Sequence, residues 1–240
     1  YTWTFVGAFA STHAFIDGKE GSILAGTRNG ARISRDEGRT WSTVKGPMGG
    51  IETFCFARDG AKMYAGTAEG LFVRLNQQPW AKRLARYDSD VPVWAIGIDP
   101  HWEDGLWLVG PVGILRSDDG GNQLRSAGRN TLIGTASILP TEQPGHLLAA
   151  GLDGVWESQD GGLRWRPIVN GLPSPSSHFL VMAFDGPAVA GKDGVFRIEA
   201  ADASATIAEE APTVDPPGAD MSTLVHVAIG RSGMAMSEIL

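Results

Sequence analysis

Short apolar runs alternate with glycine-containing turns along nearly the whole chain. Six segments share one pattern: ILAGTRNGARIS, MYAGTAEGLFVR, WLVGPVGILRS, LLAAGLDGVWES, AVAGKDGVFRI and HVAIGRSGMAMS. Such runs are too short for helices and are bounded by turn residues, so they predict β-strands. The second glycine of each segment supplies the positive φ of a tight hairpin turn, so each segment predicts two antiparallel strands.

These hairpins recur at a nearly constant spacing of 40, 44, 41, 40 and 39 residues. The first glycines of the segments are Gly26, Gly66, Gly110, Gly151, Gly191 and Gly230. A further apolar run, such as ETFCFA, precedes most hairpins, and a fourth strand follows four of them, opening at Trp41, Trp80, Leu124 or Trp165. Four-stranded units of about 40 residues are typical of a β-propeller, whereas a sandwich does not explain six equal periods.

We therefore predict an all-β fold, a six-bladed β-propeller of four-stranded antiparallel blades, with residues 1–240 as a single domain. The sixth unit ends without a fourth strand, while the chain begins with the apolar segment YTWTFV. We expect Thr2 to Val6 to complete the last blade, which would close the ring with strands from both ends of the chain. The proline-rich stretch 200–224 predicts no definite strand.

A polar box follows the hairpin in three units, as SRDEGRTW, SDDGGNQL and SQDGGLRW. An Asp at the third position can accept hydrogen bonds from the N–H groups of its own turn, and the Gly two residues later permits a left-handed backbone. We predict that these residues hold the turn together: Ser34, Asp36, Gly38, Trp41, Ser117, Asp119, Gly121, Ser158, Asp160, Gly162 and Trp165. The segment RLNQQPW, from Arg74 to Trp80, is a degenerate copy.

These boxes resemble the S-x-D-x-G-x-T-W motif of the Asp-box, or BNR, repeat family. The resemblance extends over all six repeats, although the fifth and sixth carry no box. It implies a propeller whose boxes join the third and fourth strands, away from the binding site, so that their carboxylates are structural. Members include sialidases, other glycoside hydrolases, sorting receptors and assembly factors similar to the photosystem II stability protein. Many are exported, which implies an extracytoplasmic location, and a start at Tyr1 leaves open whether a leader or anchor precedes it.

A sialidase, by this resemblance, would need three arginines that hold a carboxylate and a tyrosine paired with a glutamate. The segment FRIE at Phe196–Glu199 is similar to the family's F-R-I-P motif, but it lacks the proline and falls in a third strand. Tyr64 lies inside a predicted strand, whereas Tyr87 lies in a charged loop with Arg86 and Asp88, which we interpret as a solvated connection. We assign no catalytic residue.

Any ligand or partner is expected on the face opposite the boxes. This face is built from the turns between second and third strands and from the loops that enter each first strand. The candidates are His13, Arg28, Glu52, Glu69, Arg86, Tyr87, Asp88, Asp153, His178, Lys192 and Asp193. His13 and His178 could hold a metal, but no third ligand is evident, so we expect polar channel lining and no metal.

The composition excludes several classes of protein. A formal net charge of −7 gives no general attraction for phosphate backbones, so we expect no nucleic-acid partner. The single cysteine, Cys55, rules out an internal disulfide, and we interpret it as a small buried hydrophobe. No apolar run is long enough for a transmembrane segment, and we expect no cofactor.

Short loops and missing catalytic sets favour a non-catalytic scaffold that binds another protein. The resemblance to stability factors implies an accessory or assembly subunit of a larger, membrane-associated complex. The alternative is a glycoside hydrolase or glycan-binding protein of sialidase-like architecture, which would need two carboxylates converging across the cleft. Trp102, in the loop segment DPHWEDG, is expected to be exposed, where it could anchor a partner protein, stack on a sugar or cover the blade edge.

Overall fold

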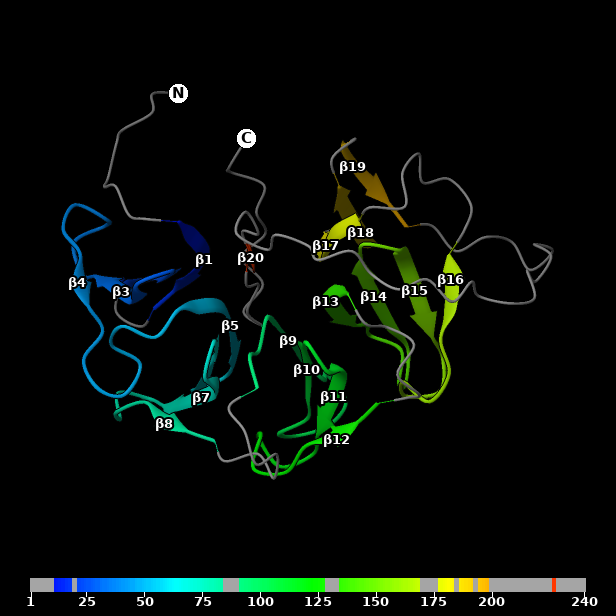
Figure 1. Cartoon of the computed structure of the whole chain (residues 1–240), viewed down its shortest axis with the longest axis horizontal. Coiled ribbons are helices and arrows are strands. Elements are labelled where there is room, and N and C mark those ends of the chain that lie inside the picture. The colour runs from blue at the N-terminus through cyan, green and yellow to red at the C-terminus, as the bar shows by residue number, and fades with distance from the viewer. Residues whose placement is uncertain are drawn as a thin grey trace.

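The computed structural model describes residues 11–18, 21–83, 91–127, 134–168, 177–183, 186–191, 194–198 and 226–227. These residues form β-strands and connecting turns, and no helix occurs among them. Figure 1 shows the strands gathered into five sheets that stand around a common centre. The prediction of an all-β fold is confirmed, and the arrangement is propeller-like.

Each of the first four sheets contains four consecutive strands that pair antiparallel with their neighbours. Sheet 1 consists of β1 (Thr12–Asp17), β2 (Ile23–Thr27), β3 (Gly30–Ser34) and β4 (Ser42–Thr43). Sheet 2 consists of β5 (Thr53–Asp59), β6 (Lys62–Thr67), β7 (Gly70–Leu75) and β8 (Ala81–Lys82). Sheet 3 consists of β9 (Ala95–Ile98), β10 (Leu106–Gly110), β11 (Gly113–Ser117) and β12 (Arg125–Ser126). Sheet 4 consists of β13 (Thr135–Pro140), β14 (Leu147–Gly151), β15 (Gly154–Ser158) and β16 (Arg166–Ile168).

Sheet 5 has three strands among the described residues, namely β17 (Ser177–Ala183), β18 (Gly186–Gly191) and β19 (Gly194–Arg197). In all five sheets the first strand lies nearest the common centre, and the last strand lies toward the rim (Figure 1). Successive first strands contact one another. The strand ends therefore gather on two opposite faces: the box face, with the turns between third and fourth strands, and the hairpin face, with the turns between second and third strands.

Neighbouring sheets pack face to face, so the middle strands are buried on both sides. On β6, Met63 packs into the core shared with sheet 1, whereas the next residue, Tyr64, packs into the core shared with sheet 3. On β10, Leu106 packs toward sheet 2, and Trp107 packs toward sheet 4. Because successive side chains of a strand point to opposite faces, a strand between two cores must be apolar at every position. This is why these strands read as continuous apolar runs.

The two ends of the chain are only partly described. The predicted closing strand, Thr2 to Val6, and the stretch 200–224 lie outside the described residues, so the sixth blade and the closure of the ring stay predictions. The described part of the sixth unit, β20 (His226–Val227), pairs parallel with β1. The sequence predicts an antiparallel hairpin there. The inner edge of β1 offers backbone groups to which any nearby extended segment can hydrogen-bond.

The described residues contain no helix that is long and apolar enough to cross a membrane.

We predict that the turn after β15 has no room for a side chain at Gly162. Its φ is +81°, and an added Cβ would lie 2.9 Å from the Trp107 ring of sheet 3. Gly162→Ala should therefore lower the free energy of unfolding by about 2 to 4 kcal/mol, because overpacking adds to left-handed strain. Gly113 has a similar φ of +91° with open space around it. In urea titrations, Gly113→Ala should lower the free energy of unfolding by only about 1 kcal/mol. Equal losses for the two variants would contradict the close packing of Gly162 against sheet 3.

Candidate functional site

On the box face, the three box turns share the hydrogen bonds made by their Ser hydroxyl and Asp carboxylate. In the first, the Ser34 hydroxyl donates to Asp36 Oδ1 (2.8 Å) and accepts the N–H of Gly38 (2.8 Å). Asp36 Oδ1 also accepts the backbone N–H of Thr40 (2.8 Å), and Oδ2 accepts the Thr40 hydroxyl (2.6 Å). The Trp41 indole N–H donates to the carbonyl of Gly38 (2.8 Å). All of these bonds lie within eight consecutive residues.

The second and third boxes repeat the bonds of the Ser hydroxyl and of Asp Oδ1, and the third also repeats the indole bond. Asp119 Oδ1 accepts the Ser117 hydroxyl (2.8 Å) and the N–H of Gln123 (2.9 Å). In the third box, Asp160 Oδ1 accepts the N–H of Arg164 (2.9 Å). The remaining bonds of the third box are Ser158 Oγ to Asp160 Oδ1 (3.0 Å), Gly162 N to Ser158 Oγ (2.9 Å) and Trp165 Nε1 to the carbonyl of Gly162 (3.1 Å).

In sheet 2 the chain makes a similar turn between its third and fourth strands, but the box Asp is missing. Arg74, one residue before the end of β7, stands where sheets 1, 3 and 4 have the box serine, and its guanidinium lies over the buried Trp80 ring, 5.1 Å from the centroid. Asn76 adopts a φ of +53°, and its N–H donates to the carbonyl of Ala61 (2.9 Å). In sheet 3, the N–H of Gly120, which has a φ of +69°, donates in the same way to the carbonyl of Asp104 (2.9 Å). The left-handed turn therefore persists where the Asp is lost.

The box carboxylates are held ionised by their own turns. The side-chain hydroxyl of Thr40, then its backbone N–H and the Ser34 hydroxyl, lower the pKa of Asp36 to about 2. The backbone N–H of Arg164 likewise lowers the pKa of Asp160. A carboxylate with such a low pKa is a poor general acid or base near neutral pH. We keep the structural role of the boxes as our interpretation.

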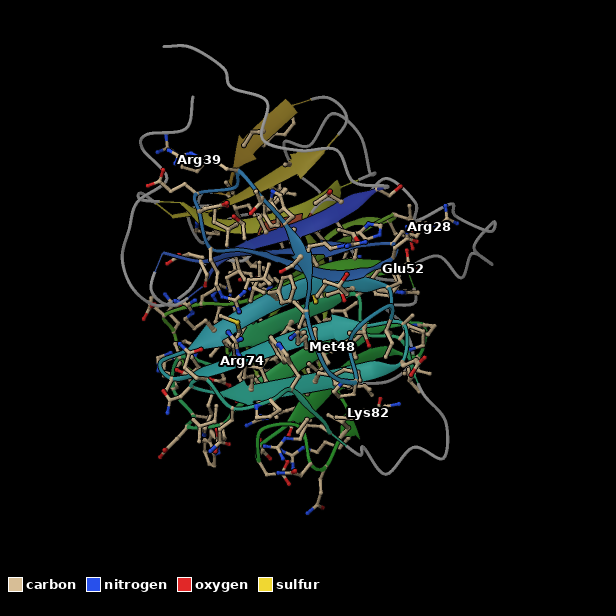
Figure 2. All side chains as sticks on the ribbon, turned by 90° about the vertical axis from the view of Figure 1, so that its left-hand side faces the viewer. Arg28, Arg39, Met48, Glu52, Arg74 and Lys82 are labelled. Carbon is tan, nitrogen blue, oxygen red and sulfur yellow. The ribbon has the colours of Figure 1, made fainter. Side chains whose placement is uncertain are left out.

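The hairpin face carries the candidates for binding. Four of its turns have two residues between their strands: 28–29, 68–69, 111–112 and 152–153. Figure 2 shows Arg28 and Glu52 toward one edge of the molecule, opposite Arg39 of the first box. Arg28, Glu69 and Asp153 are exposed on the turns of sheets 1, 2 and 4. The turns between second and third strands are thus short and regular, and they carry isolated charges.

Two of these candidates, Glu52 and Glu69, contact basic side chains of neighbouring segments. His13 Nε2 lies 3.1 Å from Glu52 Oε1, and this contact joins β1 to the segment that enters β5. His13 is almost fully buried, whereas the Glu52 side chain keeps about a third of its exposure. Glu69 pairs with Lys82 of β8 at 3.9 Å. These contacts tie neighbouring segments together. Among the described residues, no hydrogen bond joins one candidate carboxylate to another.

The remaining candidates are only partly placed. Each of the strands β1, β5, β13 and β17 carries a β-bulge near its start, and His13 and His178 stand at equivalent bulge positions in β1 and β17. Among the residues that the structure describes, no group of His, Cys, Asp and Glu side chains could hold a metal. The other candidates lie outside the described residues: Arg86, Tyr87, Asp88, Lys192 and Asp193.

Two further groups contain side chains that can act as nucleophiles. Cys55 is buried, and burial raises the pKa of its thiol to about 12, so it is not a nucleophile at neutral pH. Thr141 Oγ1 lies 2.9 Å from His146 Nδ1, and His146 Nε2 lies 2.8 Å from Glu157 Oε1. This set resembles a nucleophile, base and acid, but the threonine hydroxyl also accepts the N–H of Gln143 within a tight turn. We interpret it as a turn cap.

A pocket of about 380 Å³ opens on the box face between sheets 2 and 3. Its lining includes Asp59, Lys62, Leu75, His101, Trp102 and Glu103. The sequence identified only Trp102 of this group, as an exposed aromatic, and it is indeed 55% exposed. No pattern along the chain could indicate the pocket, because its residues come from two sheets and from loops about 40 residues apart.

No protein-family model and no curated protein matches this sequence. Solved structures do match the fold. The extracellular domain of BT4673 from B. thetaiotaomicron has a TM-score of 0.63 at 17% identity, over 80% of this chain and 27% of that chain. The GH74 xyloglucanase from Xanthomonas campestris has a TM-score of 0.55 at 16% identity, over 78% of this chain and 35% of that chain.

YCF48 is a third similar protein. YCF48 from Cyanidioschyzon merolae has a TM-score of 0.59 at 12% identity, over 83% of this chain and 71% of that chain. A structure of YCF48 bound to D1 peptide has a TM-score of 0.57 at 19% identity, covering 81% and 67% of the two chains. The chain spans only about a third or less of the extracellular domain and of the xyloglucanase. At these identities the similarity defines a propeller-like fold alone.

We predict that the box carboxylates contribute to stability. Asp160→Ala should leave the N–H of Arg164 and the Ser158 hydroxyl without their acceptor and lower the free energy of unfolding by about 1 kcal/mol, since the turn is exposed to water. Denaturant titration measures this loss. Asp153→Ala, on an exposed hairpin turn, serves as the control and should leave stability within about 0.5 kcal/mol.

Acid should destabilise the protein through the same turns. The folded state lowers the pKa of Asp36 from 3.8 to about 2, so the stabilisation is present above about pH 4 and is lost as the pH falls toward 2. Asp36→Asn should flatten the pH dependence of the denaturation midpoint across this window. An unchanged slope would show that Asp36 is not held ionised by its turn.

Proposed function

We propose that this chain is a non-catalytic propeller scaffold that binds another protein through its hairpin face, as an accessory or assembly subunit of a larger, membrane-associated complex. The supporting observation is the uniform length of the hairpin turns. Four described turns of this face contain two residues each, so this part of the face has low relief. Enzymes built on such scaffolds place their chemistry in long loops, whereas a flat surface with scattered charges suits a protein partner.

Several comparisons support the proposal. YCF48, which shares the fold, has been solved bound to a D1 peptide, so a propeller of this kind can hold a protein segment. An extracytoplasmic location is supported by the extracellular domains among the similar structures. The box carboxylates are engaged in their own turns, whereas Arg28, Glu69 and Asp153 present exposed charges on three turns of the hairpin face.

A glycan-active or glycan-binding protein is the second candidate. GH74 enzymes share the fold, and Glu52, Glu69 and Asp153 supply carboxylates on the hairpin face. A glycosidase needs two carboxyl groups about 5 to 10 Å apart, one of them available as an acid. Glu52 is paired with His13, and Glu69 is paired with Lys82. These pairings favour binding over catalysis.

We expect that the tagged chain, isolated from its source cells, carries a stoichiometric protein partner. A triple variant with Arg28→Ala, Glu69→Ala and Asp153→Ala should lower recovery of that partner about tenfold or more, because it removes exposed charges from three turns. Quantitative mass spectrometry of the isolated complex measures this recovery.

A matched triple variant on the box face, with Glu37→Gln, Arg39→Ala and Arg164→Ala, serves as the control, because these side chains are also exposed. It should retain the partner. In parallel, the purified chain is assayed for turnover of glycosides. Clear turnover, abolished by Glu52→Gln or Asp153→Asn, would contradict the proposal and support the glycan-active alternative.

A further inference from the structure

Two large apolar side chains are exposed at one place on the box face, in the pocket between sheets 2 and 3. Trp102, from the loop between β9 and β10, is 55% exposed, and Leu75, at the end of β7, is 42% exposed. The two residues belong to different sheets, so the pocket between them depends on the docking of sheet 2 on sheet 3. Exposed apolar groups gathered around a hollow indicate a surface that is covered in use.

The polar lining of the same pocket is mainly anionic. Asp59 and Glu103 contribute carboxylates, and Glu103 takes part in no ion pair among the described residues. The one lysine of the lining, Lys62, donates its ammonium to Asp104, so its charge is already compensated. The carboxylates of the lining therefore outnumber its ammonium groups, and the chain as a whole has a net charge of −7.

The indole at the pocket already interacts with a guanidinium. The Arg116 guanidinium lies over the Trp102 ring, 5.9 Å from the centroid, and over the Trp107 ring at 5.1 Å. Arg116 is itself paired with Asp118 at 2.8 Å, so its charge is compensated. The electron-rich face of an indole attracts cations, and the nearby carboxylates of Asp59 and Glu103 strengthen that attraction. A neutral sugar can also stack on an indole, but it carries no charge for the carboxylates of Asp59 and Glu103 to attract. The lining therefore suits a cation better than a neutral sugar.

We propose that this pocket is a second binding site, separate from the hairpin face, for a basic peptide segment of a partner protein. An Arg or Lys side chain lays its alkyl stem on Trp102 and its charged end beside Glu103 and Asp59, while an aliphatic neighbour covers Leu75. A pocket of about 380 Å³ can hold one such side chain with part of its neighbour. The site goes beyond the proposed function, because it adds a chemically defined contact on the opposite face.

The test is an NMR titration of the isotope-labelled chain with two dipeptides, N-acetyl-Leu-Arg-amide and N-acetyl-Leu-Gln-amide. The backbone signals of Lys62 and Leu75 serve as readouts, so that Trp102 itself can be changed. The arginine dipeptide should shift these signals saturably, with at least fivefold tighter binding than the glutamine dipeptide. Binding should weaken severalfold when salt is raised from about 50 to 300 mM, because exposed charges are screened.

Variants locate the site. Trp102→Ala should weaken binding of the arginine dipeptide about fivefold or more, and Glu103→Gln about threefold. Glu37→Gln removes an exposed glutamate elsewhere on the box face and should leave binding unchanged. Because Trp102 and Glu103 are exposed, neither change should disturb folding, and far-UV circular dichroism checks this.

Three outcomes would overturn the proposal. Equal affinity for the two dipeptides would show that the site does not select a cation. Saturable shifts with cellobiose, and none with the arginine dipeptide, would assign the pocket to a carbohydrate instead. The absence of shifts with every probe at about 50 mM would show that the pocket binds no such side chain. The hairpin-face variants test a different surface, so either proposal can fail while the other stands.

Discussion

The face-to-face packing of neighbouring sheets is the constraint on which the rest of the structure depends. Each middle strand contributes alternate side chains to two cores, as Met63 and Tyr64 do on β6. A polar residue at such a position would be buried without a partner, so the strands leave little room for functional side chains. Chemistry and recognition must therefore reside at the strand ends, on the hairpin face and the box face, where turns can vary without disturbing a core.

The two faces differ in a way that follows from their turns. Two-residue turns return the chain at once, so the hairpins of the hairpin face have low relief and present single charges such as Arg28 and Asp153. The box face has longer turns, and its loop between β9 and β10 places Trp102 beside the end of sheet 2. Short hairpins with single charges suit one kind of contact, and a pocket beside an exposed Trp suits another. We therefore assign the hairpin face and the pocket to separate partners or to separate parts of one partner.

Local patterns in the sequence predict the structure well wherever the interactions are local. Each hairpin depends on apolar runs and glycines within about ten residues, and the bonds of Asp36 close within its own turn. Contacts between sheets are not predictable in this way. The pair between His13 and Glu52 spans 39 residues in the chain, and the pocket beside Trp102 requires two sheets to dock. The pairing of β20 with β1 is of the same kind, because nothing near His226 in the sequence indicates it.

The degenerate turn of sheet 2 bears directly on what the box carboxylates do. An arginine over a tryptophan stands there in place of the box serine and its aspartate, yet the left-handed residue and its bond to the neighbouring turn persist. What the fold requires is a turn that reverses into the fourth strand and covers the end of the core. Hydrogen bonds to Asp160 meet this requirement in sheet 4, and the stacking of Arg74 on Trp80 meets it in sheet 2. Two different interactions thus stabilise the same kind of turn. A catalytic role for the box carboxylates would not explain why the turn of sheet 2 lacks its Asp.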